Sequence, residues 1–148
     1  MTGVTLSQAS TIVDQALAKG RELNLHPLTV VVLDAGGHMV AMKREDRSGI
    51  LRMEIALGKA WGTLGMGFGG REFARRAASG GAVFLQALMA ASGGRIVPAP
   101  GGVLIRDAAG EIVGAVGISG DTSDQDEACC VAGILAAGLK PDTGADPA

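Results

Sequence analysis

Apolar residues near the start of the chain recur at the three- and four-residue spacing of one face of an α-helix. They are Leu6, Ala9, Val13, Ala16, Leu17 and Leu23. Thr5 and Gln8 have the spacing of a capping box, in which each side chain binds the backbone N–H of the other residue. Pro27 cannot continue a helix, because its ring clashes with the preceding turn and it has no N–H to donate. The pattern therefore predicts a first helix from Thr5 to Asn24.

Two pairs of short apolar segments, rich in β-branched residues, predict two β-hairpins. The first pair covers residues 28–33 and 39–42, joined by the turn sequence DAGGH; the second covers 103–105 and 112–118, joined by RDAAGE. Because these strands come as adjacent hairpins and do not alternate with helices, we expect an antiparallel sheet with helices packed against it. The predicted fold class is α+β.

Helical patterns separated by glycine occupy the region between the two hairpins. They cover residues 51–66, 71–78 and 82–92. A last, alanine-rich helix is expected after Thr122 and Gln125, which form a second capping-box pair. We expect residues 1–148 to form one domain, with an ordered core over about 5–139 and a flexible tail over 140–148.

Composition narrows the range of partners. The net charge is −2 and only 3% of residues are aromatic, so the chain offers neither a basic patch nor stacking rings for nucleic acid. Hydrophobic residues make up 47% and charged residues 19%, so we expect apolar faces to be buried between subunits of a homo-oligomer. The first residues lack a basic region followed by an apolar stretch, and no charge-free apolar run is long enough to span a membrane. We therefore expect a cytoplasmic protein.

Two catalytic motifs are incomplete. Ser119 lies between Gly117 and Gly120, but Asp121 stands where the final glycine of a GxSxG nucleophile elbow is needed, so a serine hydrolase is not expected. Residues 65–70 are rich in glycine but lack the GK[ST] sequence and follow a predicted helix, so a phosphate-binding loop is not expected.

The cysteines and histidines do not predict a metal site. Cys129 and Cys130 are adjacent on a predicted helix and point about 100° apart, so we expect small core residues and no bridge between them. His26 follows the first helix and His38 lies in a turn, so both are expected at the surface. No pair of these residues has metal-ligand spacing, and a metal is not predicted.

The segment from Val97 to Glu127 is the most informative place to look for a site. It joins a Gly-Gly bend and a hairpin to an acidic helix start. Gly114 and Gly117 interrupt its second strand, which indicates either tight packing of a helix on the sheet or close approach of a backbone or ligand.

Charged side chains in two other places offer candidate chemistry. Residues 43–47 form a dense cluster where a strand leads into a helix, and such connections often carry function, although a solvated connection explains the charge equally well. Lys59 lies among apolar and small residues, a setting that disfavours its charged form and suits a proton-transferring base. The alternative is that Lys59 pairs with a carboxylate.

Four segments together resemble one protein family over residues 5–139. They are VVLDAGGHMVAMKRED, EIALGKAWGTLGMG, VPAPGGVLIRDAAGEIVGAVGISGDTSDQDE and the closing alanine-rich helix. The chain resembles the GlcG/HbpS family of haem-binding-like proteins, which includes the carboxy-terminal domain of PduO corrinoid proteins. The resemblance implies a profilin-like antiparallel sheet flanked by helices, assembled into tetramers or octamers with ligand sites near subunit interfaces.

Matched position by position, the motifs of the family imply a set of site residues. They are Arg44, Asp46, Lys59, Gly101, Gly102, Asp126 and Glu127. The resemblance also implies haem or a corrinoid as cofactor in some relatives, and isomerisation of small unsaturated carboxylates in others. Haem-binding relatives can use a histidine of the first helix as axial ligand, and residues 5–24 contain none.

The first functional hypothesis is a small-molecule-binding protein for haem or another flat, anionic ligand. Cationic side chains would face the carboxylates of the ligand. They are Arg44, Arg52 and Lys59. Gly101 and Gly102 would let the backbone approach the ligand closely, and the cations would converge beside this bend.

The second hypothesis is an isomerase or tautomerase that moves a proton on a small unsaturated carboxylic acid. An arginine would anchor the carboxylate while Lys59, Asp46 or Glu54 exchanges the proton. A structural accessory role is a third class, for which the sequence offers no positive support.

Overall fold

The computed structural model describes residues 3–145. Its first helix, α1, covers Leu6–Glu22 and begins with the predicted capping box. Gln8 N donates to Thr5 Oγ1 over 3.1 Å, and Thr5 N donates to Gln8 Oε1 over 2.9 Å. The helix ends at Glu22 with Leu23 as its C-cap, ahead of Asn24 in the left-handed conformation, so the predicted helix is confirmed to within two residues.

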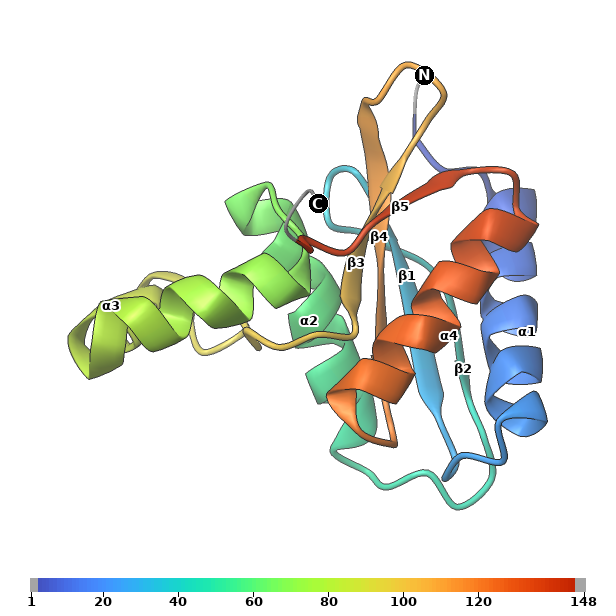
Figure 1. Ribbon diagram of the computed structural model, residues 1–148, viewed down its shortest axis with the longest axis horizontal. Helices are drawn as coiled ribbons and strands as arrows, with labels where there is room; N and C mark the ends of the chain where they lie inside the picture. Colours follow the sequence, from blue (N-terminus) through green and yellow to red (C-terminus); the bar gives the residue numbers. More distant parts are fainter. Residues whose placement is uncertain (1–2, 146–148) are drawn as a thin grey trace.

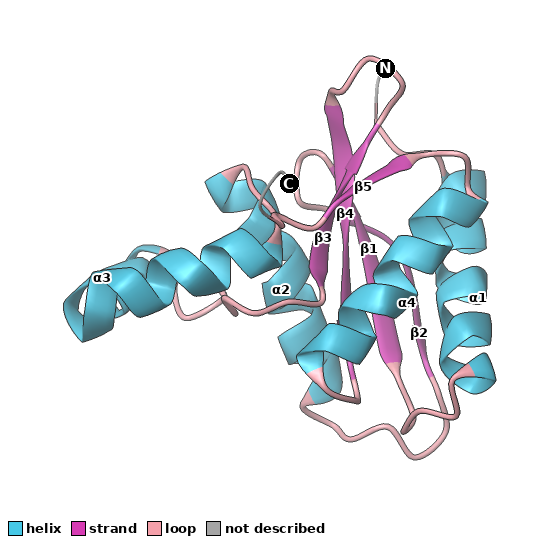
Figure 2. Cartoon of the chain, in the orientation of Figure 1, coloured by secondary structure: helices cyan, strands magenta, loops and turns pink. Residues whose placement is uncertain are grey.

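Five strands form one antiparallel sheet in the order β2-β1-β4-β3-β5. They are β1 (Thr29–Asp34), β2 (Met39–Arg44), β3 (Gly102–Arg106), β4 (Ile112–Ser119) and β5 (Lys140–Asp142). Both predicted hairpins are present, and each hairpin contributes one strand to the central β1–β4 pair. The α+β class with an antiparallel sheet is thereby confirmed (Figures 1 and 2).

The short fifth strand differs from the flexible tail expected over 140–148. Pro141 lies opposite Ile105 of β3, and Arg106 Nε donates to Asp142 Oδ2 over 2.9 Å. A segment of three residues that includes a proline is too short to show a periodic pattern. Its pairing depends on the free edge of β3, which the sequence of the segment does not reveal. Residues 146–148 lie outside the described part of the chain.

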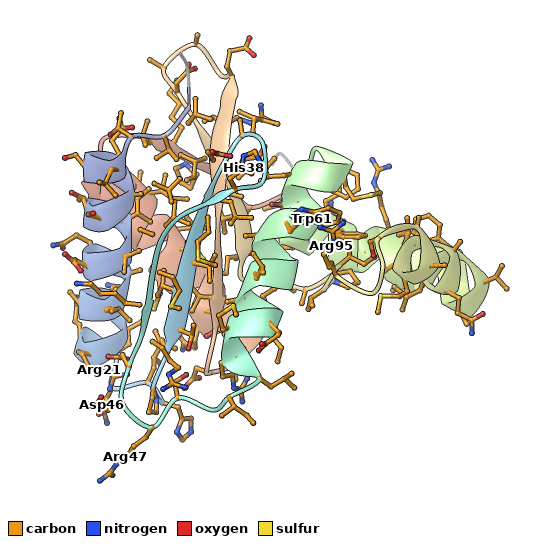
Figure 3. All side chains as sticks on the ribbon, turned by 180° about the vertical axis from the view of Figure 1, so that it is seen from behind. Arg21, His38, Asp46, Arg47, Trp61 and Arg95 are labelled. Atoms are coloured by element: carbon orange, nitrogen blue, oxygen red, sulfur yellow. The ribbon has the colours of Figure 1, made fainter. Side chains whose placement is uncertain are left out.

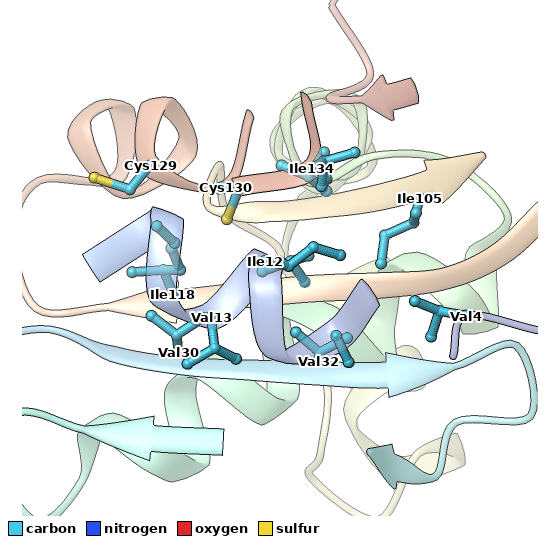
Figure 4. Close-up of a cluster of buried hydrophobic side chains, with 14 of the residues drawn as sticks. Val4, Ile12, Val13, Val30, Val32, Ile105, Ile118, Cys129, Cys130 and Ile134 are labelled. Carbon is cyan, nitrogen blue, oxygen red and sulfur yellow. The ribbon is translucent and has the colours of Figure 1, made fainter. Parts of the chain in front are cut away.

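Alternating side chains of the sheet face two separate layers of helices. One layer contains α1 and α4 (Ser123–Ala136), which lie side by side over a cluster that includes Ile12, Val30 and Ile118 (Figure 4). Cys129 and Cys130 are free and buried in this cluster, as predicted. Burial raises the pKa of the Cys129 thiol to about 11 and also raises that of Cys130, so both stay protonated core residues.

The second layer is α2, which covers Arg52–Met66 and packs directly on the backbone of the sheet. Gly102 and Gly117 are partners across β3 and β4. A Cβ added to Gly117 would overlap the carbonyl oxygen of Ala56, and one added to Gly102 would lie 2.5 Å from the carbonyl oxygen of Lys59. Tight helix packing therefore accounts for the glycine that interrupts β4 at this position.

The third helix, α3, covers Gly70–Ala91 and projects to one side of the molecule (Figure 1). Gly81 has φ 74° and ψ −172°, which breaks the helix at the joint predicted between two helices. Side chains beyond the break are largely exposed, among them Val83 at 81%. Within residues 3–145, no helix is both long and apolar enough to cross a membrane.

Candidate ligand-binding site

A buried ion pair joins α2 to the start of α4. Lys59 Nζ lies 3.3 Å from Asp126 Oδ2 and donates to the carbonyl oxygen of Ile118 over 2.9 Å. The two side chains are only 4% and 1% exposed. Lys59 therefore has the carboxylate partner that was the alternative to a free catalytic amine.

The bend before β3 covers this ion pair. Gly101 has φ +101°, and a Cβ added there would lie 2.8 Å from Lys59 Nζ and 3.1 Å from Asp126 Cβ. Only glycine allows the backbone to pass so close in this conformation. The second carboxylate oxygen of Asp126 accepts from Asp121 N over 3.0 Å. The glycine bend thus encloses the ion pair and brings Lys59, Gly101, Gly102 and Asp126 together, while their roles toward a ligand stay predictions.

Burial dominates the titration of Asp126. Removal from water raises the pKa of its carboxyl group, while the Lys59 charge and the hydrogen bond from Asp121 oppose that rise. Both carboxylate oxygens of Asp126 bind protein groups, one Lys59 and the other the backbone N–H of Asp121. The Lys59–Asp126 pair therefore links α2 to α4.

An apolar cavity of about 410 Å³ opens on the other side of α2. It is lined by Gly37, Leu51, Glu54, Ile55, Leu57, Gly58, Trp61, Gly94, Arg95 and Val97. Its size lies within the range of about 300–1,000 Å³ that is typical of small-molecule sites. Trp61 also borders two smaller cavities of about 170 Å³ each, so its indole lies at the centre of this hollowed region.

Gly58 allows the segment after α3 to form one wall of the cavity. Val97 N donates to the carbonyl oxygen of Gly58 over 3.2 Å. A Cβ at Gly58 would lie 2.5 Å from the carbonyl oxygen of Arg95 and 2.6 Å from Val97 Cγ2. Gly94, with φ +80°, turns the chain into this wall.

The polar groups of the cavity are few and differ in sign. The Arg95 guanidinium lies over the Trp61 ring, 4.0 Å from its centroid, and Arg95 Nε donates to the carbonyl oxygen of Ser92 over 3.0 Å (Figure 3). Glu54 lines the cavity from the first turn of α2. An arginine whose guanidinium lies over an indole can still donate its remaining N–H groups to a carboxylate.

Other predicted site residues lie elsewhere. Arg44 and Asp46 line a separate open cavity of about 380 Å³, together with Arg21 and Glu45. Figure 3 shows Asp46 and Arg21 at the end of the molecule away from Trp61 and Arg95. Arg44 therefore does not join Lys59 beside Gly101.

The last two predicted ligand-binding residues bind protein groups. Arg52 donates through one guanidinium nitrogen to Ser119 Oγ over 3.1 Å. Glu127 forms a two-pronged ion pair with Arg71, at 3.0 and 3.1 Å, which helps raise the pKa of Arg71. Both contacts hold α2 or α3 against neighbouring elements, so any ligand role for these side chains stays a prediction.

In the part of the chain that the structure describes, the histidines and acids do not assemble a metal site. His26 is exposed, and the side chain of His38 is 82% exposed beside Asp34, 3.3 Å from its Oδ1. Across residues 3–145, no three His, Cys, Asp or Glu side chains lie close enough to share a metal ion.

Two residues of the cavity, Trp61 and Arg95, were not among the predicted site residues. Trp61 is the one tryptophan of the chain, but at helical spacing it looks like an ordinary core residue. Arg95 follows Gly93 and Gly94, a pair that signals a turn. Their contact joins positions that are far apart in sequence, and no local pattern reveals it.

Comparisons with known proteins agree with the fold. The family model described as haem degrading protein HbpS-like matches residues 4–135. An uncharacterized 15.0 kDa protein from the dhaT-dhaS intergenic region of Citrobacter freundii is 31% identical over 125 residues, covering 83% of this chain and 84% of that protein.

Two solved structures are similar over nearly the whole chain. The crystal structure of a PduOC:heme complex has a TM-score of 0.82 at 23% identity, covering 93% of this chain and 96% of that one. The crystal structure of HbpS has a TM-score of 0.77 at 26% identity, covering 91% and 90% of the two chains. Together with the family match, these similarities show that the chain belongs to the HbpS-like family, the GlcG/HbpS family that its motifs resemble.

Proposed function

We propose that the protein binds a flat, anionic small molecule in the cavity beside α2. The observation that carries this proposal is the Arg95 guanidinium stacked on Trp61 at the edge of an apolar cavity of about 410 Å³. The indole and the aliphatic walls offer a surface for a planar ring system, and Arg95 offers donors for its carboxylate.

Haem is the first ligand to test, because a relative of similar fold is known as a heme complex. The described residues that line the cavity include no His, Cys, Met or Tyr, the side chains that usually ligate haem iron. The cavity therefore offers groups for the ring and for a carboxylate of such a ligand but none of these side chains for its iron. We infer that binding depends on Trp61 and Arg95 and needs no axial ligand from the cavity.

A titration of the purified protein with haemin tests this proposal directly. Trp61 is the one tryptophan and the chain has no tyrosine, so intrinsic fluorescence reports on this cavity alone. We expect haemin to quench it at micromolar concentrations, and Arg95→Gln to weaken binding about tenfold through loss of a charged hydrogen bond.

The matched control is Arg76→Gln. Arg76 also stacks on an aromatic ring, 4.5 Å from the centroid of Phe68, but it does not line the cavity. This variant is expected to bind haemin like the wild type. Binding that is unchanged by Arg95→Gln would refute the proposed site, and fluorescence unchanged by haemin would remove haem as the ligand.

We further propose that the protein forms a homo-oligomer with the cavity near a subunit interface. Large apolar side chains are exposed next to the cavity and on the projecting part of α3, with Ile50 at 89% and Val83 at 81%. Exposed apolar groups of this kind are typical of surfaces that other protein surfaces cover.

A further inference from the structure

The cavity beside α2 contains two charges of opposite sign that are not neutralised by the protein. Within residues 3–145, neither Arg95 nor Glu54 has an oppositely charged group within 4.0 Å. Arg95 contacts the Trp61 ring and the carbonyl oxygen of Ser92, which leaves its positive charge uncompensated. Both charges are therefore available to a ligand.

The two charges lie at opposite ends of the apolar wall. Glu54 and Trp61 are separated by seven positions of α2, which corresponds to about 10.5 Å of helix rise and about two turns. Both residues therefore face the same cavity, with Leu57 and Gly58 between them. Since Arg95 stacks on Trp61, the guanidinium is near one end of this wall and the Glu54 carboxylate near the other.

We infer that the ligand of this cavity carries a carboxylate at one end of a flat apolar body and an amine or similar N–H donor at the other. The inference rests on the proposed function and adds the second, cationic end. Haem lacks such an end, so haemin tests the anion site alone. Glu54 is exposed at the rim of the cavity, and a ligand with acids at both ends would bring a second negative charge toward it, which is unfavourable even where water screens the repulsion. An amine at that end would form an ion pair instead.

The negative charge of Glu54 also has a structural role to separate from ligand binding, because Glu54 lies in the first turn of α2. Negative charge there interacts favourably with the helix dipole. That role would affect the stability of the helix but not the choice between ligands. Ligand selectivity therefore separates the two roles.

Three matched biphenyl probes test the inference through Trp61 fluorescence. They are 4′-(aminomethyl)biphenyl-4-carboxylic acid, biphenyl-4-carboxylic acid and 4-(aminomethyl)biphenyl. We expect the amino acid to bind the wild type about threefold to fivefold more tightly than the acid alone, the range of a partly exposed ion pair. In Glu54→Gln this preference should disappear. In Arg95→Gln the two probes with a carboxylate should bind more weakly, whereas the binding of the amine should not change.

The outcomes distinguish the inference from the proposed function. If the simple acid binds the wild type as tightly as the amino acid does, or if Glu54→Gln keeps the preference, the cationic end is refuted while the anion site stands. If neither these probes nor haemin change the fluorescence of Trp61, the proposed function fails with it. Thermal unfolding of each variant, expected to match the wild type within a few degrees, excludes loss of folding as the cause.

Discussion

Lys59 Nζ lies 3.3 Å from Asp126 Oδ2, and the two residues belong to helices on opposite faces of the sheet. Breaking a buried pair by removing one partner leaves the other charge without compensation. We expect Lys59→Met to lower the free energy of unfolding by about 3 kcal/mol, measured by urea unfolding with Trp61 fluorescence.

The double variant Lys59→Met with Asp126→Leu is the control for this prediction. It removes both charges, so we expect it to lose less stability than the sum of the two single variants. Strictly additive losses would show that the two side chains are not coupled.

The pH dependence of stability follows from the raised pKa of Asp126. An acid with a higher pKa in the folded state binds more protons folded than unfolded. The stabilisation that Asp126 contributes through its protonated form is complete below its ordinary pKa of 3.8. It is lost as the pH rises through the higher pKa of the folded state. We expect the stability of the wild type relative to Asp126→Asn to fall from about pH 4 upward. Urea unfolding across this range measures the difference, and a rise would contradict the prediction.

Two glycines of α2 make a matched pair for testing the cavity wall. Alanine at Gly58 would press on the carbonyl oxygen of Arg95 and on Val97, whereas alanine at Gly65 meets no atom within 4 Å. We expect Gly58→Ala to cost about 1–3 kcal/mol and to weaken ligand binding. Gly65→Ala should stabilise the helix by up to about 1 kcal/mol. Equal effects at both positions would mean that the segment around Arg95 does not pack on α2 in this way.

The oligomer can be tested at the projecting part of α3. We expect sedimentation velocity to give the wild type a mass above that of one chain. Val83→Asp, which places a charge on an exposed apolar position, should shift the mass toward the monomer. Ser7→Asp adds the same charge at an exposed polar position of α1 and should leave the mass unchanged. A monomeric wild type would contradict the predicted assembly.

Most of the fold could be predicted from local patterns, because the interactions that form its helices and hairpins join residues close together in the sequence. The hydrogen bonds between Thr5 and Gln8 connect residues three positions apart, and both hairpins follow from apolar runs around short turns. The second capping box is only half formed, because Thr122 N donates to Asp121 in place of Gln125. A neighbouring acid can thus displace a partner that spacing alone favours.

The site was less predictable, because its contacts join distant parts of the chain. Lys59, Gly101 and Asp126, which the family resemblance implied as site residues, meet in one buried cluster, and their role toward a ligand stays a prediction. Arg44 has the positive charge that a site for an anion needs. Charge alone, however, does not indicate which cavity a side chain lines. Arg95 reaches Trp61 through the turn at Gly93 and Gly94 that follows α3 and through the close approach at Gly58.

The glycine pair beneath α2 has a mechanical consequence. Where Gly102 faces the carbonyl group of Lys59 and Gly117 that of Ala56, the backbone of the helix lies directly on the strands. The rotation of α2 about its own axis is held by contacts around this point, among them the packing of Ala60 in the core, the Lys59 ion pair and the contact of Gly58 with Val97. A small roll of α2 would change the spacing between Glu54 and the wall opposite it, so the shape of the pocket and the integrity of the core are adjusted together.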